Sequence, residues 1–355
     1  MANFISIRLT VRRVVLLAVL MTIWALPSLY ATGGQEEGPV VNVYTHRHYE
    51  ADRQLYAAFT EETGIEVNVV EAGADELIQR LASEGENSPA DILVTVDAGR
   101  LHRAKEMGLL QSVDSSELNR LVPATLRDPE GYWYALTVRA RIVVYAPAEV
   151  NDPPATYGEL ADPRWEGRIA VRSSSNIYNV SLLASMVAHQ GVVEATAWAE
   201  GIVDNLARRP QGNDRDQIRA VAAGDADLAI VNSYYVGLML NSDDRSDRGV
   251  AESVAVAFPR HESPGSGTHI NISGAGVTAA APNRENALRL LEFLAGDQAQ
   301  TLYAQANYEY PIRPDLPLAP AVAEWGAFEP DDLNLSALGE YAGEATEISN
   351  AVGWE

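Results

Sequence analysis

The stretch Asp91-Ile92-Leu93-Val94-Thr95-Val96 is a short run of strand-forming residues with little polar interruption. A strand that is apolar on both faces is typical of a parallel sheet covered by helices on both sides. Before it, residues 40–44 and 65–69 have strand patterns, and helical patterns follow them over residues 49–63 and 74–82. This alternation predicts a doubly wound α/β lobe.

A second series of strands and helices follows. Strands are predicted at residues 136–145, 168–172 and 228–231, and helices at about residues 179–190, 192–205 and 214–223. Two further β-rich stretches, 254–258 and 268–279, precede an amphipathic helix at residues 283–295. The chain therefore crosses between lobes more than once, which predicts two α/β lobes joined by extended segments, with a ligand cleft between them.

The composition excludes several classes of function. The 355 residues are enough for two domains, and 49 Asp and Glu against 26 Lys and Arg give a formal net charge of -23. Such a charge repels phosphate backbones, so we expect no nucleic-acid partner. Because the chain has no cysteine, it has no disulfide, thiolate metal site or cysteine nucleophile.

The first residues have the pattern of an export signal. Three arginines precede the apolar stretch 14–26, and small residues follow it near Ala31. This order predicts a signal peptide over residues 1–31, a tether over 32–39 and a periplasmic location. The alternative is a retained membrane anchor, because the bulky Leu29 lies close to the expected cleavage point.

Two short motifs have simple structural explanations. Gly274, Gly276 and Ala279 match a dinucleotide-binding pattern, but no helix follows directly, so we expect a glycine-tolerant strand. Arg172, Ser173 and Ser174 precede a predicted helix. They are expected to take part in helix capping, although the same helix start could hold a small anion.

Aromatic and imidazole side chains follow two predicted strands. His48 and Tyr49 come just after the first strand, and Tyr234 and Tyr235 come just after residues 228–231. In α/β proteins ligands bind at this end of the strands. Adjacent residues in an extended segment point in opposite directions, so Tyr234 and Tyr235 can share one site only if the backbone turns there.

Clustered phenols would favour one kind of ligand. A phenolate oxygen is hard and negatively charged, so it suits a small, highly charged cation, and Fe3+ fits best. Each phenol must lose a proton to bind, so affinity should fall in acid. Four phenolates leave one negative charge on Fe3+, which Arg139 or Arg141 could balance; ordinary salt bridges are the alternative role for both arginines.

Several blocks of the sequence resemble periplasmic ferric-iron-binding proteins of ABC importers, especially the cyanobacterial type that holds iron with tyrosines. The resemblance spans nearly the whole chain after Val40 and includes VNVYTHRHYEAD, ADELIQRLASEGENSPADILVTVDAGRL, ADPRWEGRIAVRSSSNIYN, ARRPQGND, NSYYVG, GTHINISGAGV and NYEYPIRPD. It implies a type II periplasmic binding protein fold: two lobes, each a β-sheet flanked by helices, with a hinge of crossover strands. We expect an N-lobe of residues 40–138 and 266–315 and a C-lobe of residues 139–265 and 316–355.

The resemblance also implies a ligand set. Tyr49, Tyr178, Tyr234 and Tyr235 would coordinate Fe3+, whereas members differ in whether the imidazole at His48 binds. Relatives often have an arginine where this chain has Leu238. Arg139, which matches another conserved arginine of the family pattern, or protonated His48 would then balance the charge, and the preference for Fe3+ over Fe2+ stays open.

The expected protein is a monomeric receptor without enzymatic activity that delivers Fe3+ to a membrane permease with its ATPase. Whether carbonate, citrate or another anion completes the iron shell is left open by the sequence. Two alternatives remain. A receptor of the same fold for a polyamine would need carboxylates and stacked aromatic rings in the cleft, and an exported metalloenzyme would need open metal positions and a general base.

Overall fold

The central feature is an eight-stranded mixed sheet with the strand order β2-β1-β3-β8-β4-β6-β5, and β7 pairs with β4. The computed structural model describes residues 38–355. The expected signal peptide, residues 1–31, and most of the expected tether, residues 32–39, lie outside the described residues. Within residues 38–355, no helix has the length and apolarity needed to cross a membrane.

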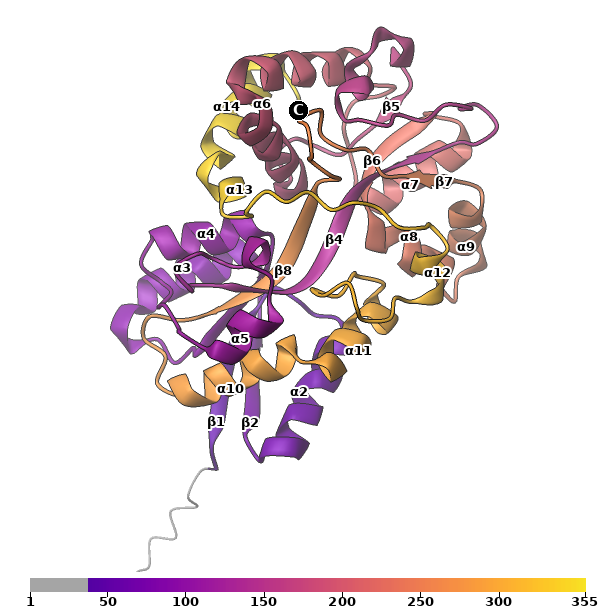
Figure 1. Cartoon of the computed structure of the whole chain (residues 1–355). Coiled ribbons are helices and arrows are strands. Elements are labelled where there is room, and N and C mark those ends of the chain that lie inside the picture. Colours follow the sequence, from indigo (N-terminus) through magenta and orange to yellow (C-terminus); the bar gives the residue numbers. More distant parts are fainter. Residues whose placement is uncertain (1–37) are drawn as a thin grey trace, which may run out of the picture. The chain divides into compact units, whose positions relative to one another are not determined.

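The first lobe is built around the parallel strands β1, β2 and β3, as Figure 1 shows. Its elements are β1 (Val40–Thr45), α2 (Glu50–Thr63), β2 (Glu66–Glu71), α3 (Ala74–Glu84), β3 (Ile92–Val96), α4 (Ala98–Glu106), α5 (Ser116–Leu121), α10 (Arg284–Ala295) and α11 (Asp297–Asn307). All five residues of β3 are buried, as its apolar run predicts. However, β3 is parallel to β1 and antiparallel to β8, so the sheet is mixed.

The second lobe surrounds β5, β6 and β7. Its elements are β5 (Ile169–Ala170), α6 (Ile177–Asp204), α7 (Asp214–Ala223), β6 (Leu228–Asn232), α8 (Ser233–Leu240), α9 (Arg245–Glu252), β7 (Ala255–Ala257) and α14 (Ala342–Val352). The short helices α12 (Pro320–Ala323) and α13 (Ala337–Glu340) lie along the returning C-terminal segment. Gly191, with φ of 85°, interrupts α6, so the two helices predicted on either side of it are both present.

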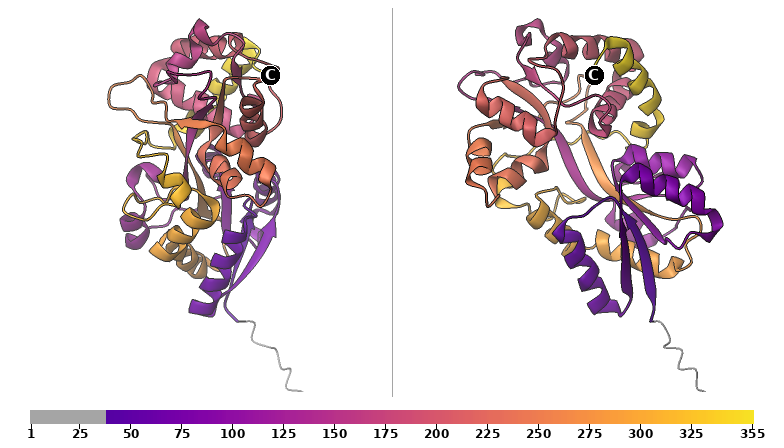
Figure 2. Two further views of the ribbon diagram at one scale, coloured as in Figure 1. Left: turned by 90° about the vertical axis from the view of Figure 1, so that its right-hand side faces the viewer. Right: turned by 180° about the vertical axis from the view of Figure 1, so that it is seen from behind.

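Two long strands join the lobes. The first part of β4 (Tyr134–Tyr145) pairs with β8 (Ile270–Val277), and its last residues, Arg141–Tyr145, pair with β6. Figure 2 shows this two-stranded ribbon running between the lobes, with helices outside each group of strands. The predicted two-lobed α/β fold is therefore confirmed, and the residue limits of the lobes stay predictions.

The glycine motif lies inside β8, as the strand prediction requires. A Cβ atom on Gly276 would come within 2.5 Å of the Tyr132 carbonyl oxygen, and one on Gly274 within 2.8 Å of the Tyr134 carbonyl oxygen. Glycine at these positions therefore permits close packing of β8 against the neighbouring chain, and no dinucleotide-binding turn is formed.

Candidate functional site

Four tyrosines from three helix starts define the candidate site. Tyr49 immediately precedes α2 in the first lobe, and Tyr178 is the second residue of α6 in the second lobe. Tyr234 and Tyr235 lie in the first turn of α8. Figure 1 shows α2 in one lobe and α6 and α8 in the other, so the site draws on both lobes.

The start of α8 explains how adjacent tyrosines share one site. The extended strand β6 ends at Asn232, and the helix begins at Ser233. Successive side chains on a helix are about 100° apart rather than opposite, so the Tyr234 and Tyr235 rings stay close, with centroids 4.2 Å apart. The turn that the sequence required at this point is present, although the helix itself was not predicted.

The four phenols influence one another. Tyr234 is buried, and the pKa of its phenol is raised well above the ordinary value by burial and then by the phenols of Tyr178, Tyr49 and Tyr235. Burial also raises the pKa of Tyr235 and of Tyr49. The Tyr234 hydroxyl interacts with Tyr49 and lowers the Tyr49 pKa in part. The phenols of Tyr49, Tyr234 and Tyr235 are therefore neutral at pH 7 and lie close to one another.

His48 lies beside the cluster rather than within its buried part. Its side chain is exposed, and its ring stacks on that of Tyr49 with centroids 5.6 Å apart. Its Nδ1 atom is 3.4 Å from the His46 carbonyl oxygen. His48 is therefore at the rim of the site, and its role as a metal ligand stays a prediction.

Arg47 fixes the position of Tyr49, and the sequence reasoning did not single it out. The buried Arg47 guanidinium forms ion pairs with Asp52 at 3.0 Å and Glu309 at 3.1 Å, and it lies 5.1 Å from the centre of the Tyr49 ring. Asp52 also accepts a hydrogen bond from the Tyr49 backbone N–H. The chain after β1 is thus held to the first lobe by buried charges.

Arg139 and Arg141 have different environments. Both are buried on the same face of β4, and their guanidinium carbons lie 5.2 and 5.9 Å from the Tyr178 ring centre. Arg141 uses both terminal nitrogens, with an ion pair to Asp214 at 2.8 Å and a hydrogen bond to Asn179 at 2.7 Å, and only its Nε lacks a partner within residues 38–355. In contrast, none of the three Arg139 guanidinium nitrogens has a hydrogen-bond partner among residues 38–355. Arg139 therefore carries a buried positive charge beside the phenols that forms no hydrogen bond within residues 38–355. Burial raises the pKa of the Asp97 carboxyl, and the charge of Arg139 opposes that rise.

The segment before α6 contains the predicted anion candidates. Arg172 forms an ion pair with Asp214 at 3.2 Å and lies 5.4 Å from the Tyr178 ring centre. The Ser173 hydroxyl is 2.8 Å from that of Ser175, and the buried Ser174 hydroxyl donates to the Trp354 carbonyl oxygen. Asn176 caps α6, as expected of this segment. Ser174 is therefore already bonded, whereas Arg172 faces the tyrosines.

The ribbon of β4 and β8 presents a polar face to the tyrosines. A small cavity there is lined by Arg139, Arg141, Tyr178, Asn232, His269 and Asn271. Burial lowers the pKa of His269 well below its usual range, so its imidazole is neutral. Polar residues at every second position, His269, Asn271 and Ser273, were the signal in the sequence that could have identified this face.

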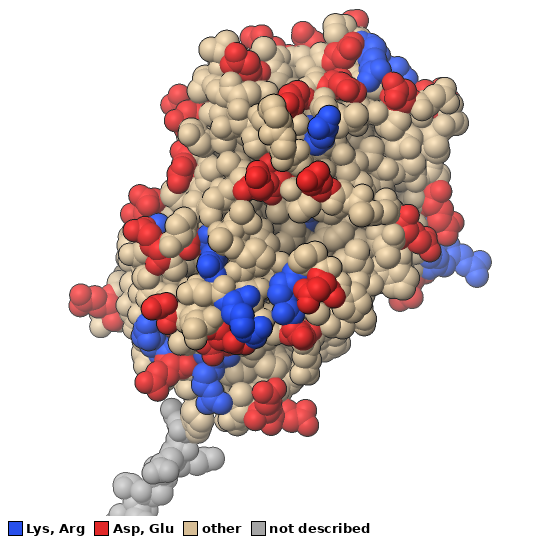
Figure 3. All heavy atoms as spheres, viewed as in Figure 1, with Lys and Arg blue, Asp and Glu red and all other residues tan. Residues whose placement is uncertain are grey.

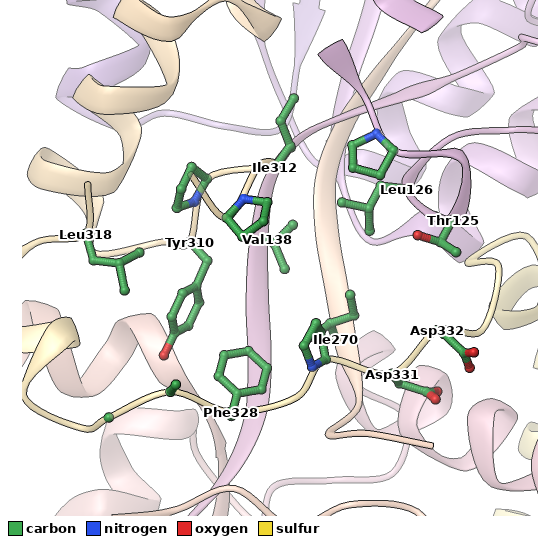
Figure 4. Close-up of a pocket in the computed structure, with 16 residues that line it drawn as sticks. Thr125, Leu126, Val138, Ile270, Tyr310, Ile312, Leu318, Phe328, Asp331 and Asp332 are labelled. Carbon is green, nitrogen blue, oxygen red and sulfur yellow. The ribbon is translucent and has the colours of Figure 1, made fainter. Parts of the chain in front are cut away.

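A larger cavity of about 410 Å³ is lined by residues from the other face of the same ribbon (Figure 4). Val138 and Ile270 alternate with Arg139 and Asn271, and they join Tyr310, Phe328 and other apolar side chains around this cavity. Its lining is mostly apolar, apart from the carboxylates of Asp331 and Asp332. The phenols and the buried arginines lie on the opposite face of the ribbon.

Hard oxygen donors, a buried cation and a position between lobes form an arrangement that suits a small, highly charged cation. Comparisons with known proteins agree with the fold. Residues 54–330 match the family described as bacterial extracellular solute-binding protein. Iron uptake protein A1 of Synechocystis sp. is 50% identical over 91% of this chain and 89% of its own length.

The major ferric iron-binding protein of Neisseria meningitidis is 28% identical over 77% of this chain and 81% of its own length. A Trichodesmium protein, solved in complex with iron and citrate, superposes with a TM-score of 0.86 and 45% identity, covering 89% of this chain and 100% of that structure. With a family match over most of its length and a relative of 50% identity, this chain belongs to the bacterial extracellular solute-binding proteins.

Proposed function

We propose that this protein captures Fe3+ between its lobes and delivers it to an ABC importer, and that Tyr49, Tyr178, Tyr234 and Tyr235 bind the ion. The meeting of four phenols from three distant segments carries this proposal. Packing alone does not require it, because grouped buried hydroxyls are costly to desolvate unless a partner compensates them.

Arg139 supports the proposal through its charge. Four phenolates around Fe3+ leave one negative charge, and the buried, unpaired guanidinium of Arg139 can balance it. Arg139 can neutralise this charge even though the chain has Leu238 where relatives often have an arginine. It favours the ferric over the ferrous ion, because Fe2+ with the same ligands would leave a second negative charge in a buried site.

The relatives support iron as the cargo. Proteins that are half or nearly half identical to this chain include an iron uptake protein and a structure with iron and citrate. A carboxylate-bearing anion such as citrate could complete the shell, and Arg172 and Ser173, beside Tyr178, are the groups that we propose to contact it. His48 at the rim would cover the entrance rather than complete the buried shell.

Lobe closure follows from the placement of the ligands. Tyr49 lies in the first lobe and the other three tyrosines in the second, so bound iron favours the closed form by its stronger binding to that form. We propose that the closed protein, a monomer located in the periplasm, docks on a permease that works with a cytoplasmic ATPase. It performs no chemical turnover in this role.

Titration of the apo-protein with ferric citrate tests the function. We expect one equivalent to produce a visible phenolate-to-iron charge-transfer band. Y234F and Y235F should weaken or shift this band, whereas Y341F, which changes a partly buried tyrosine at the start of α14, should leave it intact.

A colourless endpoint would overturn the iron proposal. Tight polyamine binding in the same protein would then favour an organic-cation receptor, and hydrolytic activity that depends on added metal would favour an exported metalloenzyme. A band that Y234F and Y235F do not change would refute the proposed ligands but not the cargo.

A further inference from the structure

Three further metal-binding side chains meet away from the tyrosines. The Nε2 atom of His189 lies 2.7 Å from Oδ2 of Asp331, and the Nε2 atom of His261 lies 3.8 Å from the same oxygen. One ligand atom of each residue lies within 4.8 Å of the other two. In the part of the chain that the structure describes, no second group of three His, Asp or Glu side chains is so close.

The three residues come from separate segments that backbone contacts hold in place. His189 lies on α6 just before its interruption, His261 lies between β7 and β8, and Asp331 lies between α12 and α13. The Asp331 backbone N–H donates to the Thr268 carbonyl oxygen at 2.9 Å, and the Thr268 N–H donates to Glu329 at 2.8 Å. The segment that carries Asp331 is thereby fixed to the chain leading into β8.

The cluster has an unused polar atom. Oδ1 of Asp331 is buried and has no hydrogen-bond partner within residues 38–355. Nε2 of His261, the ring nitrogen nearer to Asp331, also lies 3.3 Å from the Ser185 hydroxyl. The His189 side chain is 13% exposed, whereas His261 is nearly inaccessible, so an ion would enter past His189.

We propose that His189, His261 and Asp331 bind a divalent cation with the ligand preference of Zn2+, with water in the fourth position. Two imidazoles and one carboxylate are a common set of protein ligands for Zn2+. Zn2+ bonds of about 2.0 Å place tetrahedral ligand atoms about 3.3 Å apart, a spacing that lies between the two distances in this cluster. The borderline imidazole ligands separate this site from the hard phenols, which suit Fe3+.

The site would connect α6 to the segments that cross between the lobes. Asp331 and His261 both lie next to the strand that enters the ribbon at Thr268, and His189 lies on a helix of the second lobe. A bound ion would fix these three segments to one another. Because the ion binds only the folded arrangement, it should also stabilise the protein against unfolding.

Titration of the full protein with Co2+, in the double variant Y234F/Y235F, tests this site. Co2+ in a four-coordinate site absorbs visible light much more strongly than hydrated Co2+. We expect one equivalent to produce this strong absorption, and excess Zn2+ to abolish it. Adding H189N, H261N or D331N separately to Y234F/Y235F should remove the absorption. Zn2+ should raise the melting temperature of Y234F/Y235F itself but not that of the proteins with one of these further substitutions.

H46N is the matched control, because His46 is a partly buried histidine of the first lobe outside the cluster. It should leave the Co2+ spectrum unchanged. H189N is the decisive variant if the buried substitutions do not fold, since His189 is at the edge of the cluster. A weak spectrum of hydrated Co2+ in the parent, or strong absorption that persists in H189N, would overturn the site without affecting the ferric site.

Discussion

Each tyrosine in the cluster must lose a proton before it can bind a metal ion as phenolate. Burial raises the pKa of Tyr49, Tyr234 and Tyr235 above the ordinary value, so the apo-protein holds neutral phenols at pH 7. Binding therefore releases protons, and the apparent affinity for Fe3+ should fall as the pH falls, by up to about one decade per pH unit for each ligating phenol. Competition with a chelator of known pH dependence measures this slope. Y235F should lower the number of protons released on Fe3+ binding, which this slope measures, by about one. An Fe3+ affinity that does not depend on pH would refute phenolate binding.

Arg139 is the second residue whose role can be measured alone. R139M removes the buried cation beside the phenols, and we expect Fe3+ affinity to fall about ten- to a hundredfold. The apo-protein should lose little stability, because R139M breaks no hydrogen bond within residues 38–355 and removes only the longer-range attraction between Arg139 and the buried Asp97 carboxyl. R141M is the matched control on the same face of β4. It should destabilise the fold, since it removes one of the two arginine partners of the buried Asp214. An unchanged Fe3+ affinity in R139M would exclude the proposed charge balance.

Among the helices and strands, Asp214 connects α7 to β4, to the segment before α6 and to β6. This fully buried carboxylate, the first residue of α7, pairs with Arg141 of β4 and Arg172 before α6, and it accepts a hydrogen bond from the Asn232 N–H at the end of β6. D214N leaves two arginines without their anion and should cost about 3 kcal/mol of unfolding free energy. Urea unfolding of the apo-protein measures this. D225N, whose exposed carboxylate has only a 3.8 Å contact to Arg208, should change stability by less than about 0.5 kcal/mol. Equal effects of both substitutions would contradict the structural role of Asp214.

For the whole molecule, the equilibrium between open and closed lobes depends on contacts across the cleft. Ser181 on α6 donates a hydrogen bond of 2.7 Å to the carboxylate of Asp97, which precedes α4 in the other lobe. S181A should destabilise the closed form relative to the open form by about 1 kcal/mol, which shifts the equilibrium of the apo-protein about fivefold toward the open form. Small-angle scattering should then show a larger radius of gyration, which Fe3+ restores. S349A, which removes a buried hydroxyl bonded inside α14, should leave the radius of gyration unchanged. If S181A and S349A gave the same radius, the hydrogen bond between Ser181 and Asp97 would not stabilise the closed form.

The distribution of charged side chains over the surface is also a property of the whole molecule. On the face shown in Figure 3, acidic side chains are spread widely and basic ones lie among them, with no continuous basic area. This distribution agrees with the net charge of -23. Repulsion between like charges at this density also favours solubility.

Local patterns determined much of the fold. Apolar runs such as 91–96 placed the strands, and helical periodicity placed α2, α3, α7 and α10, because burial of one face depends on neighbours in the sequence. The helices that were not predicted are α4, α5, α8, α9, α11, α12, α13 and α14. Of these, α8 is almost entirely apolar, so it has no polar face to produce a periodic pattern.

The types of the proposed ligands could also be predicted from the sequence, since tyrosines and histidines follow two predicted strands and the chain has no cysteine. Only the tertiary structure decided how they act together. Arg139 and Arg141 cannot be distinguished by sequence, because they lie two residues apart on one strand. In the structure Asp214 pairs with Arg141, whereas the Arg139 guanidinium forms no hydrogen bond within residues 38–355. Likewise His189, His261 and Asp331 become neighbours only when distant segments pack. Strand and helix patterns arise from local periodicity, whereas pairing of charges and ligands depends on distances that packing alone establishes.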